Sequence, residues 1–176
     1  MSELEDFRRR KDEFYGYDAH SSPLIPEQQR AFQGLRYYPE NPSLRVSATL
    51  DRDVPHDVIE MDTSTGGAQS YTRAGKIAFQ VDGEEAVLSL YSSGDSHSLF
   101  IPFRDATSGH EAYGAGRYLE VLVGPDDSVL VDFNYAYNPY CAYNEMWSCP
   151  IPPIENWLRV PIRAGEMAYE GEGSGH

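Results

Sequence analysis

The fold of this chain is decided by residues 76–90, which read KIAFQVDGEEAVLSL. Apolar side chains alternate with other residues on both sides of the pair Asp82-Gly83. A period of two residues is typical of a strand with one buried face, and Asp-Gly is a preferred two-residue hairpin turn. The stretch therefore predicts two antiparallel strands joined by a tight turn. The side chains expected to face the core are Ile77, Phe79, Val81, Ala86, Leu88 and Leu90.

The same alternation recurs on both sides of this hairpin, and Ala74-Gly75 is expected to turn the third strand into the fourth. The further strands expected are 44–50, 57–62, 69–73, 99–103, 116–123, 129–133 and 157–162. Short strands at intervals of about 8–12 residues, separated by turn residues, are typical of antiparallel barrels and sandwiches. We therefore predict an all-β fold, an antiparallel meander barrel or barrel-like sandwich of about eight to nine strands.

The residues ahead of the strands predict a helix followed by an irregular segment. Ser2 and Glu5 have the spacing of a capping box, and Gly16 is a suitable helix end. Four prolines between residues 17 and 43 interrupt any regular element. The resulting expectation is a single domain, residues 1–176, divided into an N-terminal helix (3–15), an irregular strap (17–43), a strand region (44–166) and a flexible acidic tail (167–176).

The charge balance excludes one class of partner. Asp and Glu total 28 against 14 Lys and Arg, which gives a formal net charge of -14. Such a field repels phosphate backbones, so nucleic acid is not expected as a partner. Only Lys11 and Lys76 are lysines. Abundant carboxylates with few lysines favour a halophilic source over a mere bias of coding towards arginine, and the acidic surface is then a matter of solubility.

The compartment and membrane expectations rest on what the sequence lacks. No stretch approaches the ~20 apolar residues of a membrane span, so no membrane partner is expected. The acidic start has no apolar segment of the kind found in signal peptides. Two cysteines, Cys141 and Cys149, are too few for a disulfide framework. A cytoplasmic location is therefore expected, with buried thiols favoured over a disulfide, and a disulfide over a catalytic cysteine.

Two segments depart from the simple succession of strands and turns. Residues 102–118 place charged and aromatic residues in one loop, and residues 132–149 are rich in tyrosine and asparagine. Flat aromatic walls with paired amide donors and acceptors suit a pocket for a polar small molecule. We expect the two segments to converge at a pocket mouth. The candidate ligand-binding residues are Arg104, Asp105, Tyr113, Arg117, Asp132, Asn134, Tyr137, Asn138 and Tyr143.

Each of these motifs has a structural interpretation as well. Arg104-Asp105 either binds an anionic group of a ligand or forms an ion pair that holds the loop to the rim of the expected barrel. The tyrosines and asparagines can equally cap the core and hold their own loop. The five histidines lack metal-ligand spacing, and Gly114-Ala115-Gly116 lacks the third glycine and the following helix of a phosphate loop. Neither a metal nor a cofactor is expected.

Several motifs also resemble one family. They are Gly34-Leu35-x-Tyr-Tyr-Pro39, Thr63-Ser64-Thr65-Gly66-Gly67, Pro102 to Gly109, Tyr113-Gly-x-Gly-Arg117-Tyr118, Asp132-Phe-Asn134, Tyr137-Asn138-Pro-x-Cys141-Ala-Tyr143 and Pro161-Ile-x-Ala-Gly-Glu166. The chain resembles, from about Phe14 to Glu166, the uncharacterised bacterial and archaeal family known as domain of unknown function 1684 (DUF1684). The resemblance implies no activity and no catalytic roles.

Three hypotheses of function follow from the residues. The first is a protein that binds a small polar or anionic molecule, with Arg104 as the charge anchor. The second is an enzyme acting on a small polar substrate, with Asp132 or Asp105 as general base. The third is a non-catalytic interaction module with an exposed aromatic patch around Tyr140 and Trp147.

Overall fold

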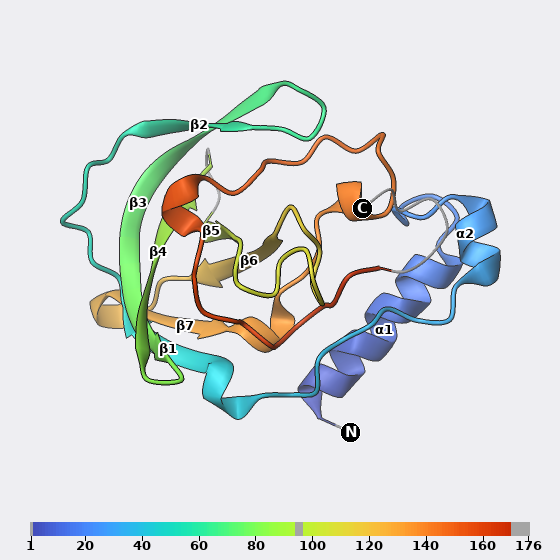
Figure 1. Cartoon of the computed structure of the whole chain (residues 1–176), viewed down its shortest axis with the longest axis horizontal. Helices are drawn as coiled ribbons and strands as arrows, with labels where there is room; N and C mark the ends of the chain where they lie inside the picture. The colour runs from blue at the N-terminus through green and yellow to red at the C-terminus, as the bar shows by residue number, and fades with distance from the viewer. Residues whose placement is uncertain (1, 94–96, 170–176) are drawn as a thin grey trace.

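A computed structural model of the chain describes residues 2–93 and 97–169 and consists mostly of strands in two antiparallel sheets, with a helix along one side (Figure 1). The helices are α1 (Glu3–Tyr17) and α2 (Pro26–Ala31), and the strands are β1 (Arg45–Thr49), β2 (Val58–Asp62), β3 (Ala68–Val81), β4 (Glu84–Ser92), β5 (Ser98–Phe103), β6 (Arg117–Leu122) and β7 (Ser128–Asp132). The predicted all-β class with an N-terminal helix is therefore confirmed.

The hairpin expected at Asp82-Gly83 is present. β3 pairs antiparallel with β4, and Ile77 lies opposite Leu88. Asp82 and Gly83 have φ angles of 51° and 82°. Two successive positive φ angles are those of a hairpin turn whose twist matches its strands, which explains the Asp-Gly pair. β3 and β4 are the second and third strands of a five-stranded sheet in the order β2-β3-β4-β5-β6.

The second sheet has two strands, β1 and β7, with Val46 opposite Val131. Single bridges join the sheets at their corners, Asp51 to Lys76 on one side and Val123 to Val129 on the other. The sheets do not close into a continuous ladder. The architecture is accordingly the barrel-like sandwich, and the alternative of a closed barrel is not realised.

Two strand boundaries were wrong. The third and fourth expected strands are one strand, β3, because Ala74-Gly75 forms a bulge and not a turn: the register shifts between Arg73 and Gly75. Residues 157–162 are not a strand. Of these residues only Trp157 forms a bridge, to Arg104. Val160 and Ile162 are buried, and the Val160 carbonyl accepts a single bond from the Ala106 amide at 3.0 Å. The described residues therefore hold seven strands, fewer than the eight to nine predicted.

The N-terminal part follows the prediction with shifted limits. The capping box of Ser2 and Glu5 is present. The helix continues through Gly16 to Tyr17, and the expected irregular strap contains the six-residue α2. Residues 167–169 are not loose, since the Met167 amide donates to the carbonyl of Arg36 at 2.8 Å. The rest of the expected acidic tail, 170–176, lies outside the described residues.

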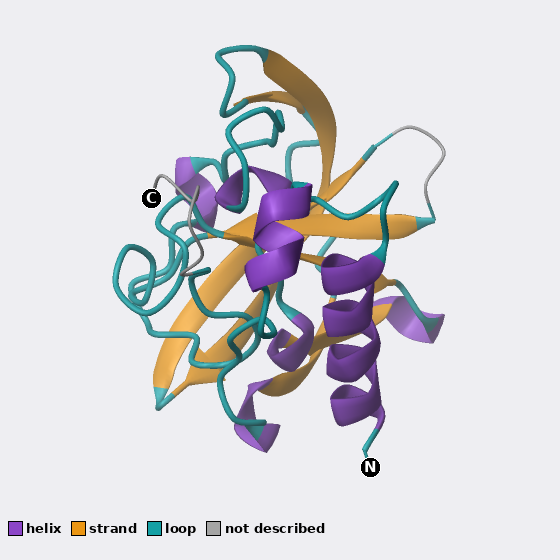
Figure 2. Cartoon of the chain, turned by 90° about the vertical axis from the view of Figure 1, so that its right-hand side faces the viewer, coloured by secondary structure: helices purple, strands orange, loops and turns teal. Residues whose placement is uncertain are grey.

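Two clusters of buried side chains occupy opposite faces of the five-stranded sheet. Leu99, Ile101 and Leu119 belong to the core between the two sheets. Phe100 and Tyr118, which alternate with them and so point to the other face, belong to a second cluster rich in tyrosine. Figure 2, seen from the helical side, shows α1 and α2 in front of the strands. The tyrosine-rich segment around 137–149 is thus packed between the sheet and the helices.

Candidate functional site

The structure uses most of the predicted site residues for its own contacts. Six of the nine are buried, namely Asp105, Tyr113, Arg117, Asn134, Asn138 and Tyr143. Arg104, Asp132 and Tyr137 are half-buried. Their contacts divide the nine residues into separate groups, which are described in turn.

Arg117 and Asp105 anchor the C-terminal segment. The fully buried guanidinium of Arg117 donates to the carbonyls of Ile162 at 2.7 Å and Ala164 at 2.5 Å, and to the Asp105 carboxylate at 3.4 Å. Asp105 accepts in addition from the Ile162 amide at 2.6 Å and the Thr107 hydroxyl at 2.7 Å. Burial lowers the pKa of Arg117, and the Asp105 charge opposes that shift. This pair ties residues 162–166 to the loop after β5.

Asp132 and Asn134 hold the strap. Asp132 caps the short 3₁₀ turn that follows β7 by accepting from the Asn134 amide at 3.0 Å. The Asn134 side chain accepts from the Asn41 amide at 2.8 Å and donates to the Asn41 carbonyl at 3.0 Å. These two hydrogen bonds hold the backbone of Asn41 in place, near the end of the strap and shortly before β1 begins.

Arg104 and Tyr113 lie apart from those groups. The guanidinium of Arg104 is 4.5 Å from the centre of the Trp157 ring, a cation–π contact just after the end of β5. The Tyr113 hydroxyl is 3.5 Å from the Cys141 sulfur. Both cysteines are buried and remain thiols, as the sequence favoured.

Asn138 and Tyr143 meet at a carboxylate that sequence reasoning missed. The Asn138 amide and the Tyr143 hydroxyl donate to Glu166 Oε1 at 3.0 and 3.1 Å, and Lys11 of α1 donates to Oε2. The Glu166 side chain is 2% exposed and the Lys11 side chain 13%. Burial and the charge of Glu166 raise the pKa of Tyr143. Its phenol is therefore a neutral donor over the whole physiological range.

Tyr137 lies in a shallow groove of about 390 Å³ on the outer face of the five-stranded sheet. The lining residues are Tyr71, Tyr91, Ser93, Ser98, Phe100, Tyr118, Glu120, Tyr137 and Pro150. Four of the rings form a row: Tyr71 to Phe100 at 5.3 Å, Phe100 to Tyr118 at 4.8 Å and Tyr118 to Tyr137 at 5.9 Å between centres. The row is continuous across β3, β5 and β6 and ends at the loop after β7.

Among the described residues that line this groove, Glu120 supplies the only charge. It is an exposed residue of β6, and the Tyr137 hydroxyl donates to its carboxylate. Burial, and after it the hydrogen bond to Glu120, raise the pKa of Tyr137. The phenol therefore stays protonated and orients the carboxylate at the end of the ring row.

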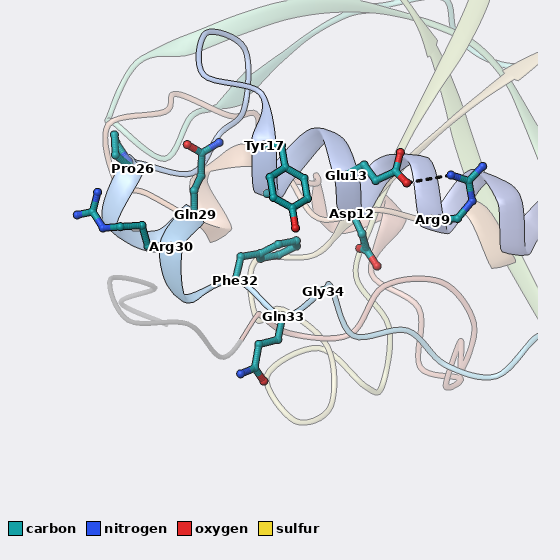
Figure 3. Close-up of a pocket in the computed structure, with 11 residues that line it drawn as sticks. Arg9, Asp12, Glu13, Tyr17, Pro26, Gln29, Arg30, Phe32, Gln33 and Gly34 are labelled. Carbon is teal, nitrogen blue, oxygen red and sulfur yellow. Dashed lines mark hydrogen bonds and ion pairs between the residues drawn. The ribbon is translucent and has the colours of Figure 1, made fainter.

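A larger cleft of about 940 Å³ separates α1 from α2 and residues 32–34 (Figure 3). Its charges are mixed: Arg9 forms an ion pair with Glu13 at 2.9 Å, and Asp12 accepts from the Leu35 amide at 3.0 Å. Burial raises the pKa of Asp12. The Tyr17 and Phe32 side chains occupy the middle of the view in Figure 3. None of the predicted site residues lines this cleft.

The aromatic patch expected around Tyr140 and Trp147 is half-buried. The two rings pack at 5.2 Å, and the Trp147 indole donates to the carbonyl of Pro23 at 3.3 Å. They belong to the second cluster and hold the loop before α2. Within residues 2–93 and 97–169, no three His, Cys, Asp or Glu side chains gather as a metal site. In the same residues, no helix is long and apolar enough to span a membrane.

The sequence carried only faint signals for the missed residues. Lys11 stood out as one of two lysines, and Glu166 as the carboxylate that ends one of the family motifs. The two residues are 155 positions apart, so no local period connects them. Glu120 is an ordinary polar position of an alternating strand, and only the fold reveals that it closes a row of rings.

Comparison with known proteins shows which family the chain belongs to, and the proteins it matches have no described activity. The family described as "Protein of unknown function (DUF1684)" matches residues 30–167. Among solved structures, this chain is similar to the solution NMR structure of the uncharacterized protein from gene locus rrnAC0354 of Haloarcula marismortui. The two are 34% identical, the match covers 93% of this chain and 91% of that one, and the TM-score is 0.71. No curated protein matches the sequence. The chain therefore belongs to the DUF1684 family of proteins of unknown function.

Proposed function

We propose that this protein binds a small organic cation, an alkylamine or quaternary ammonium, in the tyrosine-lined groove. The observation that supports the proposal is the row of four aromatic rings ending at a single carboxylate, Glu120. Aromatic faces attract cations through their quadrupole, and the attraction is strongest where water is displaced. A carboxylate at the end of such a row supplies the counter-charge.

The charge of the ligand is inferred from the groove and replaces the one inferred from the sequence. Arg104, the anchor expected for an anion, packs on Trp157 and is not among the lining residues of the groove. The lining residues that the structure describes include no Lys, Arg or His. The Lys11 ammonium lies 5.0 Å from the Tyr137 ring, but Glu166 neutralises it. A cation is therefore favoured at the groove, and the net charge of -14 adds a long-range attraction.

The groove is preferred over the helix cleft for two reasons. The cleft presents charges of both signs, which select no ligand charge. In addition, its α1 wall lies outside the residues matched by the family, 30–167, whereas every lining residue of the groove lies inside them. The enzyme hypothesis has no comparable support: Asp105 is enclosed by its own hydrogen bonds, and Asp132 caps a turn.

The proposal is tested with three probes of one shape and different charge: tetramethylammonium, tert-butanol and pivalate. Ligand-observed NMR titrations at constant ionic strength give the affinities. We expect tetramethylammonium to bind with a Kd in the millimolar range, roughly what one or two cation–π contacts and an exposed counter-ion provide. Tert-butanol is expected to bind about tenfold more weakly, since it keeps the shape and loses the charge. Tighter binding of pivalate would contradict the proposal.

A matched pair of variants assigns the binding to Glu120. Glu120→Gln keeps an oxygen that can accept from the Tyr137 hydroxyl but removes the charge, and we expect a loss of affinity of about five- to tenfold. Glu60→Gln is the control, because Glu60 is an exposed carboxylate of β2 in the same sheet and does not line the groove. Equal affinity of both variants would show that bulk charge, not the groove, attracts the cation.

A further inference from the structure

The two cysteines lie side by side in the second cluster. The Cys141 amide donates to the Cys149 sulfur at 3.3 Å. The side of Cys141 away from Cys149 is not solvent, since the Tyr113 hydroxyl is 3.5 Å from its sulfur. Cys141 is 4% exposed and Cys149 is 8% exposed. A sulfur that lies 3.3 Å from the backbone nitrogen of the other cysteine is within reach of that residue's own sulfur, as a disulfide requires.

Both cysteines are held in place by their own backbone contacts. Cys141 lies in a 3₁₀ turn, Tyr140–Ala142. Cys149 donates its amide to the Ser64 hydroxyl at 3.1 Å and accepts from the Ser64 amide at 3.0 Å. The fold therefore fixes the backbone positions that carry the two sulfurs.

We propose that Cys141 and Cys149 form a peroxide-oxidisable pair that closes into a reversible intramolecular disulfide. Cys149 is the attacking residue, because its sulfur accepts the Cys141 amide and because Cys149 is the more exposed residue of the two. The Cys149 thiolate breaks the O–O bond of hydrogen peroxide and becomes a sulfenic acid, releasing one water after proton uptake. The Cys141 thiol then attacks that sulfur, and the sulfenic oxygen leaves as the second water. In sum, two thiols and one peroxide give one disulfide and two waters.

The burial of the two cysteines determines which oxidants can reach them and how fast they are oxidised. A peroxide is small enough to reach cysteines that are less than a tenth exposed, whereas a bulky disulfide reagent is not. The hydrogen bond with the Cys141 side chain, and after it burial, raise the pKa of Cys149. The thiolate fraction is therefore small at pH 7, and the rate of oxidation is expected to rise between pH 7 and pH 9.

The disulfide would close a short loop between residues 141 and 149. This loop contains Tyr143, which donates to Glu166, and it ends next to Pro150, a lining residue of the groove. Closing so short a loop reduces the entropy of the unfolded chain, and we expect the oxidised protein to melt roughly 5–10 °C above the reduced one. The double variant Cys141→Ser/Cys149→Ser treated with the same peroxide is the control, since it reports any effect of methionine oxidation on the melting temperature.

The experiment exposes the folded, reduced protein to hydrogen peroxide and follows intact mass, thiol alkylation after unfolding and dimedone labelling. The expected wild-type product is an intramolecular disulfide that dithiothreitol reverses, with little dimedone adduct. Cys141→Ser is expected to accumulate the sulfenic acid on Cys149, and Cys149→Ser to react at least tenfold more slowly. Wild-type protein that keeps both thiols alkylatable, or that collects dimedone adduct as Cys141→Ser does, would overturn the proposal. A disulfide that forms only in urea would overturn it as well.

Discussion

Glu166 joins the two ends of the described chain through a buried ion pair with Lys11. Removing two charges from water is costly, and the attraction between them compensates only because each has further partners. Glu166 accepts from Asn138 and Tyr143, and the Lys11 ammonium lies 5.4 Å from the Tyr15 ring and 5.0 Å from Tyr137. The pair therefore fixes where α1 docks, and each partner makes burial of the other tolerable.

Removing one partner is expected to cost more than removing both. Lys11→Met leaves Glu166 as an uncompensated buried charge, and Glu166→Gln does the same to Lys11, so each is expected to lower the free energy of unfolding by about 3–5 kcal/mol. The double variant is expected to lose clearly less than the sum of the two losses. Urea unfolding of the four proteins measures the coupling. Additive losses would show that the pair contributes no specific interaction.

For single residues, the sequence indicates which side chains can form hydrogen bonds. It does not indicate whether they bind a ligand or the protein's own chain. Asn138 and Tyr143 were expected to come together, and the structure brings both to Glu166. An asparagine that orients a ligand needs the same donors and acceptors as one that orients its own chain. Composition and spacing are therefore identical in the two cases, and only the fold shows that Asn134 bonds to Asn41.

At the scale of elements, the bulge in β3 lets the long strand bend towards β1. A Cβ atom on Gly75 would lie 2.6 Å from Leu50 Cδ1 and 2.7 Å from the Asp51 carbonyl. The neighbouring bridge from Asp51 to Lys76 joins the two sheets at this corner. The absence of a side chain at Gly75 is thus what allows the corner to close.

Gly75→Ala is expected to lower the free energy of unfolding by about 1–3 kcal/mol, because a backbone carbonyl cannot move aside as a flexible side chain can. Gly67→Ala is the matched control in the turn before β3, where a Cβ meets only the Thr63 hydroxyl at 3.5 Å. That variant is expected to stay within about 0.5 kcal/mol of wild type. Denaturant midpoints compare the two variants, and equal losses would contradict the role given to Gly75.

Most elements could be predicted because alternation and turn residues act locally. The hairpin at Asp82-Gly83 is the clearest case, since pattern and turn chemistry agree. The turn predicted at Ala74-Gly75 is wrong because the same two residues are compatible with a turn or with a bulge. Pairing with the neighbouring strand determines which of the two forms. The strand predicted at residues 157–162 is wrong for another reason. Val160 and Ile162 are buried by the surrounding fold although they do not belong to a strand.

The whole molecule is expected to unfold sharply in alkali because of its tyrosines. Burial raises the pKa above 10 for Tyr15, Tyr91, Tyr113, Tyr118 and Tyr143. Above pH 10 the unfolded chain loses these protons before the folded chain does, so stability is complete below pH 10 and falls above it. Five such groups remove about 7 kcal/mol per pH unit, comparable to the whole stability of a domain.

Phenolate absorbance and circular dichroism, recorded together against pH, test this expectation. The buried tyrosines are expected to ionise only in the same narrow step, about one pH unit wide, in which the fold is lost. Gradual ionisation of all 13 tyrosines around pH 10 with the fold intact would contradict the burial of the second cluster.

Net charge leads to a second expectation for the whole molecule. At -14, repulsion between carboxylates opposes the compact state, and salt screens it. The melting temperature is expected to rise by roughly 5 °C or more between about 0.1 M and 2 M KCl. A melting temperature that falls over this range would argue against a protein adapted to salt.

Mapping where tetramethylammonium binds shows whether the groove over Tyr137 and Glu120 takes an organic cation. Backbone amide shifts of ¹⁵N-labelled protein are recorded during a titration with tetramethylammonium at constant ionic strength. The largest shifts are expected at residues 118–120, 137, 71 and 100, and Glu120→Gln is expected to reduce them. Shifts confined to the helix cleft, residues 9–17 and 26–34, or no saturable shifts at all, would contradict the claim.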